Sequence, residues 1–212
     1  MMRYGMVIDL EKCMGCHTCS ISCKMQNNIP QGMLWNRVVS VGDEGLDSVE
    51  GLFPNVKRKY IPIACQHCDN APCQKACPVG ATYYDENGSV QIDYGRCIGC
   101  RYCMAACPYN VRVFNWEEAE RHPDFNYGDG VVPVRDVGVV EKCTFCKERT
   151  SEGLDPMCVE CCPAEARVFG DLDDPKSEVS RLIRERNGEQ LLKEKGTKPK
   201  VYYLGLNGEC NR

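Results

Sequence analysis

Short stretches of apolar and β-branched residues, separated by polar turns, predict strands at several places along the chain. Residues 81–84 and 90–92 are two such runs, and the turn-like sequence DENG (85–88) lies between them. We therefore expect a β-hairpin here. Three further stretches are also expected to form strands: residues 56–63, 131–140 and 201–205.

Towards the C-terminus the pattern changes to that of an amphipathic helix. Asp174 can cap this helix, and Pro175 suits its first position, where no backbone N–H is needed. Gly188 is expected to end it. The apolar stripe of the helix consists of Val179, Leu182 and Ile183.

The apolar runs are too short to cross a membrane. A spanning helix needs roughly 18–20 consecutive apolar residues, and no stretch of this sequence approaches that length. The first residues, MMRYGMVIDL, also lack the apolar core and small-residue cleavage site of a secretory signal. We therefore expect neither a direct membrane span nor ordinary secretion.

Cysteine dominates the composition, with 18 residues among 212. All but Cys161 and Cys210 fall into four tight groups, of which the last three are followed by proline. Cys162 is preferred to Cys161 in the fourth group because it keeps the x3 spacing and the proline. The groups are Cys13, Cys16, Cys19 and Cys23; Cys65, Cys68, Cys73 and Cys77; Cys97, Cys100, Cys103 and Cys107; and Cys143, Cys146, Cys158 and Cys162.

This spacing predicts iron–sulfur clusters. Three cysteines at x2 intervals can wrap one face of a [4Fe–4S] cubane, while the fourth, one helical turn further on, ligates the other cluster of a pair. The proline after it suits the first turn of a helix, so a helix is expected to begin there. Every group is complete, and we therefore expect four [4Fe–4S] clusters.

Other cysteine chemistry fits less well. Disulfide frameworks spread their cysteines between distant loops, and zinc ribbons need neither a third cysteine at x2 nor the x3-C-P ending. A Rieske centre requires two histidine ligands, and the chain has only His17, His67 and His122. His17 and His67 lie inside cysteine loops, where they either tune a cluster or are solvated loop residues.

Charge and motifs restrict the function. The formal net charge is −4, and each oxidised cubane with four thiolates adds about −2. There is no basic stripe for nucleic acid, no phosphate loop, no dinucleotide fingerprint and no histidine-activated nucleophile. A saturated cubane offers no open iron, which favours electron transfer without an active site of its own. Basic residues flank the groups and either offset cluster charge or are ordinary surface residues: Lys12, Lys24, Arg96, Arg101, Lys142, Lys147 and Arg149.

Several motifs together resemble those of the iron–sulfur subunits of the dimethyl-sulfoxide-reductase family of molybdenum or tungsten oxidoreductases. In order, they are MVIDLEKCMGCHTCSISCK, CQHCDNAPCQKACPVGA, CIGCRYCMAACPYNVR, KCTFCKER and CVECCPAEARVFGDLDDP. The tail, GDLDDPKSEVSRLI, is most similar to the small subunits of polysulfide, thiosulfate and respiratory arsenate reductases. The resemblance implies an α+β fold of two interleaved bacterial-ferredoxin-like modules, with inserted β-rich loops and a C-terminal helix and strand tail.

The module boundaries expected from this likeness divide the chain into non-contiguous pieces. Residues 1–24 and 140–175 would form the first module, and residues 60–112 the second. Residues 25–59 and 113–139 would be insertions. The tail, residues 176–212, would pack on the core or the partner.

By the same resemblance, ligands are exchanged between groups. Cluster 1 would be held by Cys13, Cys16, Cys19 and Cys162; cluster 2 by Cys65, Cys68, Cys73 and Cys107; cluster 3 by Cys77, Cys97, Cys100 and Cys103; and cluster 4 by Cys23, Cys143, Cys146 and Cys158.

The resemblance also implies a partner, a catalytic subunit with a bis-pterin metal site that docks near cluster 1. A membrane anchor subunit, or a cytochrome- or quinone-linked donor, would be a further partner in anaerobic respiration. Periplasmic location is expected, by export together with the catalytic subunit, and a cytoplasmic complex is the alternative. The alternative function is the same electron-transfer role in a hydrogenase or another non-molybdenum complex.

Overall fold

The computed structural model describes residues 2–41, 51–118, 125, 128–132 and 135–206. His122, Cys210 and two positions of the strand predicted over 131–140 lie outside the described residues. In chain order the elements are β1 (Tyr4–Asp9), α1 (Thr18–Gln26), β2 (Arg37–Val41), β3 (Lys59–Ile63), α2 (Pro72–Lys75), β4 (Thr82–Tyr84), β5 (Val90–Ile92), α3 (Tyr102–Ala105), β6 (Val113–Phe114), β7 (Val140–Glu141), α4 (Lys147–Ser151), α5 (Met157–Glu160), β8 (Arg167–Asp171), α6 (Glu178–Glu185), η1 (Lys193–Lys195) and β9 (Val201–Leu204).

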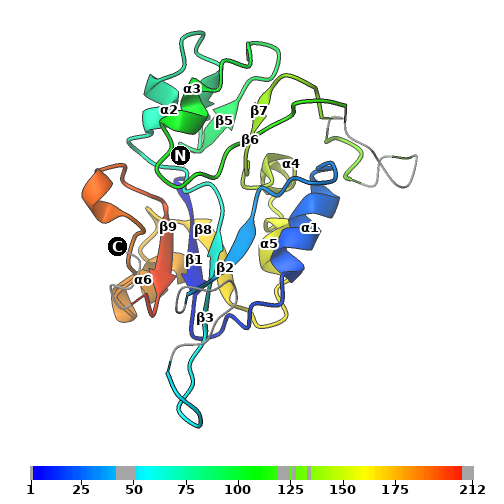
Figure 1. Cartoon of the computed structure of the whole chain (residues 1–212). Coiled ribbons are helices and arrows are strands. Elements are labelled where there is room, and N and C mark those ends of the chain that lie inside the picture. Colours follow the sequence, from blue (N-terminus) through cyan, green and yellow to red (C-terminus); the bar gives the residue numbers. More distant parts are fainter. Residues whose placement is uncertain (1, 42–50, 119–124, 126–127, 133–134, 207–212) are drawn as a thin grey trace.

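A three-stranded sheet joins segments that are far apart in the sequence. β1 is its central strand, antiparallel to β8 and parallel to β9. Ile8 therefore pairs with Arg167 on one side and with Tyr203 on the other. Figure 1 shows the strand nearest the N-terminus lying between two strands from the last quarter of the chain.

The two faces of β1 contact different cores, because alternate side chains of a strand point in opposite directions. Met6 and Ile8 belong to the main core, which also contains most of the buried cysteines. Val7 faces the other way and packs with Val179 of α6 and Leu204 of β9. The sheet thus separates the cysteine-rich core from a small apolar core beneath α6.

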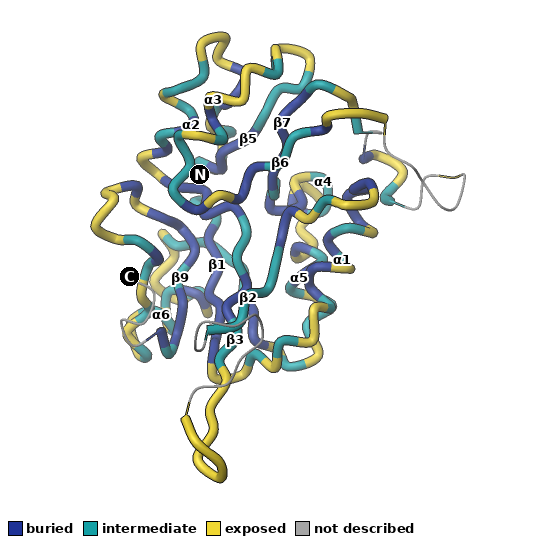
Figure 2. The backbone as a smooth tube through the Cα atoms, in the orientation of Figure 1, coloured by how far each residue is buried: buried dark blue, intermediate teal, exposed yellow. Residues whose placement is uncertain are grey.

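The remaining strands form two-stranded antiparallel pairs: β2 with β3, β4 with β5, and β6 with β7. The β2–β3 pair lies against the main core, which includes Ile61 of β3. Residues 51–58, which lead into β3, extend away from the body of the molecule (Figure 1) and are all exposed (Figure 2). Short sheets and short helices together make an α+β fold, which confirms the predicted fold class.

Most of the predicted strands are confirmed, with one exception. β4 and β5 form the expected hairpin, with Thr82 opposite Ile92; β3 and β9 lie within residues 56–63 and 201–205. The strand predicted over residues 131–140 is wrong: in the described part of this stretch only Val140 lies in a strand. Gly138 has a φ of +80°, which interrupts an extended chain immediately before β7.

The C-terminal helix is present, but both predicted ends are wrong. α6 begins after Ser177, whose Oγ accepts a hydrogen bond from Ser180 N at 3.2 Å. Asp174 instead accepts from Lys176 N, in a turn before the helix. At the other end Asn187 takes the left-handed conformation expected of Gly188, with a φ of +52°.

The local structure at the prolines of the cysteine groups also differs from the prediction: no helix begins at any of these three prolines. A short helix, α2, α3 or α5, instead begins one residue before the third cysteine of each of these groups and ends before the fourth. Each proline then takes the second position of a tight turn, where its fixed φ is favourable. The turns close with hydrogen bonds from Gly80 N to Cys77 O, from Asn110 N to Cys107 O and from Glu165 N to Cys162 O.

Candidate metal centres

The cysteines form much of the interior. Seventeen lie in the described part of the chain, and none of these forms a disulfide bond. Cys16 and Cys100 are the exposed ones among them; the others are buried or half-buried. Several belong to the main core together with Met6, Ile8 and Tyr203. The chain therefore buries thiols where most proteins of this size bury apolar side chains.

One cavity brings together cysteines from groups two and three. Cys97, Cys100 and Cys103 line it with Cys77, which follows α2. Arg112 also lies in its wall. The four cysteines are those that the resemblance places on cluster 3, three from one group and one from the other.

A second cavity brings together cysteines from groups one, two and four. Cys23 on α1 lines it with Cys143, Cys146 and Cys158, and Cys65 and Arg167 also lie in its wall. Burial raises the pKa of Cys23 well above its usual value, and negative charge on the three group-four thiols raises it further. Cys23 and those three thiols are the set that the resemblance places on cluster 4, whereas it places Cys65 on cluster 2.

The thiols expected to hold cluster 2 also lie close together. Burial raises the pKa of Cys68 to about 12, and charge on Cys65, Cys73 and Cys107 contributes to the increase. Cys107 is in turn influenced by Cys65 and Cys73. Two groups again contribute, since Cys107 closes group three.

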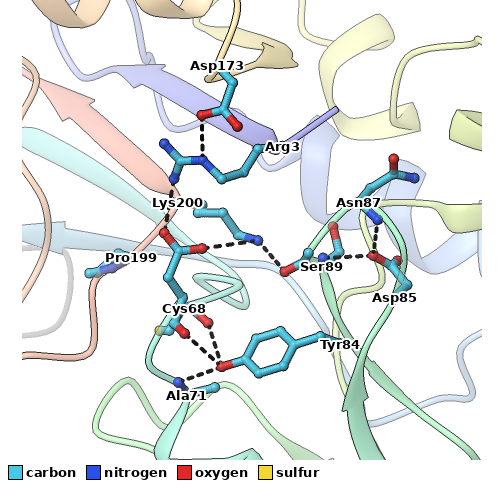
Figure 3. A network of polar contacts seen from close by, with 12 residues as sticks. Arg3, Cys68, Ala71, Tyr84, Asp85, Asn87, Ser89, Asp173, Pro199 and Lys200 are labelled. Carbon is cyan, nitrogen blue, oxygen red and sulfur yellow. Dashed lines mark hydrogen bonds and ion pairs between the residues drawn. The ribbon is translucent and has the colours of Figure 1, made fainter. Parts of the chain in front are cut away.

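The loop between the second and third cysteines of group two is fixed by a polar network (Figure 3). The hydroxyl of Tyr84 accepts a hydrogen bond from Ala71 N at 2.9 Å and donates to Asp69 O at 3.0 Å. The carboxylate of Asp69 lies 3.0 Å from Arg3 and 3.6 Å from the buried amino group of Lys200. β4 and the ends of the β1 and β9 strands thus hold this loop in place.

The set expected for cluster 1 is only partly gathered. Burial raises the pKa of Cys13, and charge on Cys19 and Cys162 contributes. Cys16 points to solvent, where its thiol lies 3.3 Å from the Thr18 hydroxyl and that contact lowers its pKa. The set expected for cluster 1 therefore contains one exposed thiol, as does the set expected for cluster 3.

The cavities suit a multi-iron cluster. Metal ligands must be thiolates, yet burial and mutual repulsion oppose ionisation of these thiols. Positive charge has to enter each set, and the irons of a cubane would supply it. A cubane also binds each thiolate to a different iron; among the described residues no three potential ligands gather closely enough for a single metal ion.

Groups one and three repeat one backbone conformation as well as one spacing. Gly15 and Gly99 precede the second cysteine with φ of +71° and +68°. His17 and Arg101 follow it, each with a φ of +60°, and a helix begins immediately afterwards. The C-x-G-C sequence thus folds into the same cluster loop at both places.

Replacing Gly99 with alanine should destabilise this loop more than the same change at Gly80. Both glycines have positive φ, and an alanine there costs about 1–2 kcal/mol. At Gly99 a Cβ would also clash with the backbone oxygen of Gly138, whereas at Gly80 nothing lies within 4 Å. We expect Gly99→Ala to lose at least about 1 kcal/mol more, measured from anaerobic urea unfolding. Equal losses would contradict the predicted backbone clash.

His67 is a buried residue of the core, which corrects its interpretation as a solvated loop residue. Its ring stacks on Phe145 with centroids 3.6 Å apart. Burial lowers its pKa well below the usual value, and Lys142 and Lys200 contribute. Both ring nitrogens lack a hydrogen-bond partner among the described atoms. His67 therefore acts as a neutral ring, while His17 is exposed.

The flanking basic residues do not form one class. Lys142 is fully buried and donates to the carbonyl oxygens of Val90 and Cys143. Sequence reasoning missed three further buried cations, Lys200 and the two arginines Arg112 and Arg167. For the two arginines a signal was available: each follows the fourth cysteine of its group by five residues.

The fold and the thiol-lined cavities together define an iron–sulfur protein of the ferredoxin-like class. The family model described as "4Fe-4S dicluster domain" matches residues 56–122 and 131–172. The chain accordingly holds multiple [4Fe–4S] clusters on ferredoxin-like modules.

Individual relatives define the family more narrowly. A dimethyl sulfoxide reductase iron–sulfur subunit of Halobacterium salinarum is 55% identical over 217 residues, which cover 100% of this chain and 81% of that protein. The arsenate respiratory reductase iron–sulfur subunit of a Shewanella species is 43% identical, covering 96% of each chain. A tetrathionate reductase subunit of Salmonella typhimurium is 40% identical, covering 97% and 73%. The chain belongs to the electron-transfer iron–sulfur subunits of dimethyl-sulfoxide-reductase-family molybdoenzymes.

The membrane prediction can be compared with the described residues. In that part of the chain no helix has the length and apolar character needed to cross a bilayer. The longest helix among these residues, α1, has nine residues, far fewer than the roughly 20 that a span requires.

Proposed function

We propose that this chain carries electrons through four [4Fe–4S] clusters, to or from a molybdenum or tungsten bis-pterin catalytic subunit. When bound, each cluster accepts and releases one electron at a time. The chain itself would have no active site, and its thiols would hold the clusters at fixed positions. The ligands would be those expected from the resemblance: Cys13, Cys16, Cys19 and Cys162 for cluster 1; Cys65, Cys68, Cys73 and Cys107 for cluster 2; Cys77, Cys97, Cys100 and Cys103 for cluster 3; Cys23, Cys143, Cys146 and Cys158 for cluster 4.

The observation that carries the proposal is the way in which the thiol sets adjoin one another. Charge on a thiol of one set influences a thiol of the next at three places, which supports the linear order 1–4–2–3. The pairs of thiols are Cys19 with Cys158, Cys143 with Cys65, and Cys73 with Cys103, and Cys65 and Cys143 also line one cavity.

In this order cluster 4 is followed by cluster 2. His67 stacks on Phe145 at the junction between these two clusters. His67 belongs to the loop of group two and Phe145 to the loop of group four. The stack excludes water from the contact between the two modules, because both rings are almost fully buried.

The two ends of this order are open to partners. Cys16 of cluster 1 and Cys100 of cluster 3 are exposed, so both terminal clusters would lie near the surface. Exposed apolar side chains adjoin each one: Met14 near Cys16, and Ile98 and Tyr102 beside Cys100. We place the catalytic subunit at cluster 1, as in the resemblance, and the second redox partner at cluster 3.

The proposed modules follow the same division. Pairing of β1 with β8 supports a first module made of residues 1–24 and 140–175. The β4–β5 hairpin and the helices α2 and α3 support a second module within residues 60–112. Residues 25–59 and 113–139 would be insertions, and residues 176–212 the tail.

We further propose a periplasmic location, reached by export of the folded complex with its catalytic subunit. Attachment to the membrane would depend on a separate anchor subunit that exchanges electrons with quinone or a cytochrome. Protease treatment of spheroplasts should then degrade the complex without lysis. A complex protected until lysis would place it in the cytoplasm instead.

Anaerobic purification of the native complex, followed by metal analysis, tests the main proposal. We expect a large partner with molybdenum or tungsten, and about 16 iron atoms attributable to this chain, because four cubanes hold four irons each. Nickel in the partner would assign the chain to a hydrogenase. An iron content of about eight atoms would contradict the proposal, because it would account for only two of the four clusters.

A further inference from the structure

Two buried arginines occupy equivalent positions in the two cysteine pairs. Arg112 follows Cys107 by five residues, and Arg167 follows Cys162 by five. Each arginine is only 4% exposed. The repeated offset and equal burial indicate one structural role that occurs twice.

Arg167 contacts thiols from two different groups. Its Nη1 lies 3.5 Å from the sulfur of Cys158, and its Nη2 lies 3.4 Å from the sulfur of Cys19. Nη2 also donates to Asn36 Oδ1 at 2.8 Å. Cys19 and Cys158 are both the third cysteine of their groups, so one guanidinium joins groups one and four.

Arg112 has the corresponding neighbours in groups two and three. It lines the cavity that contains Cys103, and its guanidinium is close enough to the thiols of Cys73 and Cys103 to interact with both. Nη1 donates to Thr82 Oγ1 at 3.3 Å. Nη2 is buried and has no hydrogen-bond partner in the part of the chain that the structure describes. Nη2 is therefore available to donate a hydrogen bond to a group inside the cavity.

Neither arginine is neutralised by a carboxylate. In the described ranges no ion pair involves Arg112 or Arg167, and both are held by neutral acceptors, Thr82 and Asn36. A buried cation without a counter-charge is costly. The negative charge that compensates it must therefore come from the thiolate-ligated sets on either side.

We propose that each arginine bridges the two clusters of one pair, donates N–H groups to a thiolate of each, and raises both reduction potentials. This inference rests on the proposed function. Reduction changes a cluster with its four thiolates from about −2 to about −3, and the electron comes from the redox partner without any bond being broken. A fixed positive charge stabilises the more negative state more strongly, and hydrogen bonds to sulfur act in the same direction.

Redox titration of the intact complex, followed by electron paramagnetic resonance, tests this proposal. Arg167→Gln should lower the potentials of clusters 1 and 4, and Arg112→Gln those of clusters 2 and 3. We expect at least a tenfold loss in each reduction equilibrium, which is about 59 mV for one electron. Arg96→Gln is the matched control: it removes a charge next to Cys97, but that side chain is 69% exposed.

The lysine variants separate charge from bridging. Arg167→Lys and Arg112→Lys keep the charge but lose the planar fork that reaches two sulfurs, so the paired potentials should fall less than in the glutamine variants. Unchanged potentials in a fully iron-loaded glutamine variant would overturn the proposal. If the glutamine variants fail to bind iron, unchanged potentials in both lysine variants would overturn it as well. Fewer than four clusters in the unmodified complex would instead overturn the proposed function.

Discussion

Cys162→Ser should cost the complex a cluster, whereas Cys161→Ser, one residue away, should cost none. Serine is a harder ligand than thiolate and binds iron in clusters poorly. We expect iron in the Cys162 variant to fall from about 16 to about 12 if the whole cubane is lost. Cluster 1 would be the cluster beside the catalytic subunit, so loss of this cluster should also abolish substrate-dependent electron transfer.

The adjacent thiol provides the control for this experiment. Cys161 is half-buried, and its sulfur lies 3.1 Å from the sulfur of Met157, on the same side of α5. Cys162 instead accepts a hydrogen bond from Ala166 N at 3.3 Å and influences the pKa of Cys13. Iron analysis and electron paramagnetic resonance of both variants decide between them. Loss of a cluster from the Cys161 variant, with the Cys162 variant intact, would reverse the assignment.

The cysteine groups could be predicted from sequence because a cluster loop is local. Ligand spacing, the glycine before the second cysteine and the following short helix all lie within about a dozen residues. The hairpin of β4 and β5 was predictable for the same reason, since its DENG turn and both strands are contiguous. The structure then brings together thiols that had been assigned to one cluster. Cys77, for example, lines one cavity with Cys97, Cys100 and Cys103.

The elements that depend on distant contacts were not predictable in this way. β1 and β8 pair across more than 150 residues, and no local pattern records such a pairing. The first residue of α6 is likewise determined by a contact between segments that the local sequence pattern does not reveal. Asp174 and Ser177 are both good caps, but the Ser177 hydroxyl also donates to Asp171 O at the end of β8 at 2.6 Å. That tertiary contact selects the later residue.

The buried arginines were missed because burial is a property of the folded chain. Arg112 and Arg167 look no different in sequence from exposed Arg96 or Arg101. The only sequence feature that the two arginines share is that each follows a fourth cysteine by five residues. The structure explains this common offset, because both side chains lie between two thiol sets.

Removing the iron should unfold most of this chain. Structural zinc sites contribute about 10–16 kcal/mol to folding, whereas the net stability of a domain is about 5–15 kcal/mol. If a cubane contributes on the same scale, the chain without its clusters has no net stability left. The helices α2, α3 and α5, which contain the third cysteines of groups two, three and four, have four residues each, too few to form alone. Anaerobic acid treatment with a chelator, followed by circular dichroism and urea titration, should therefore show no cooperative transition.

The apolar core beneath α6 is too small to preserve the central sheet after this treatment. Its buried residues are Val7, Val179 and Leu204, and each contributes about 1.5–3 kcal/mol. Ordering β1, β8 and β9, with six, five and four residues, costs about 1–2 kcal/mol per residue. The cysteine-rich face must supply the difference, so restoring iron and sulfide should restore the transition. A colourless chain that still unfolds cooperatively at the original urea midpoint would show that the sheet is stable without its clusters.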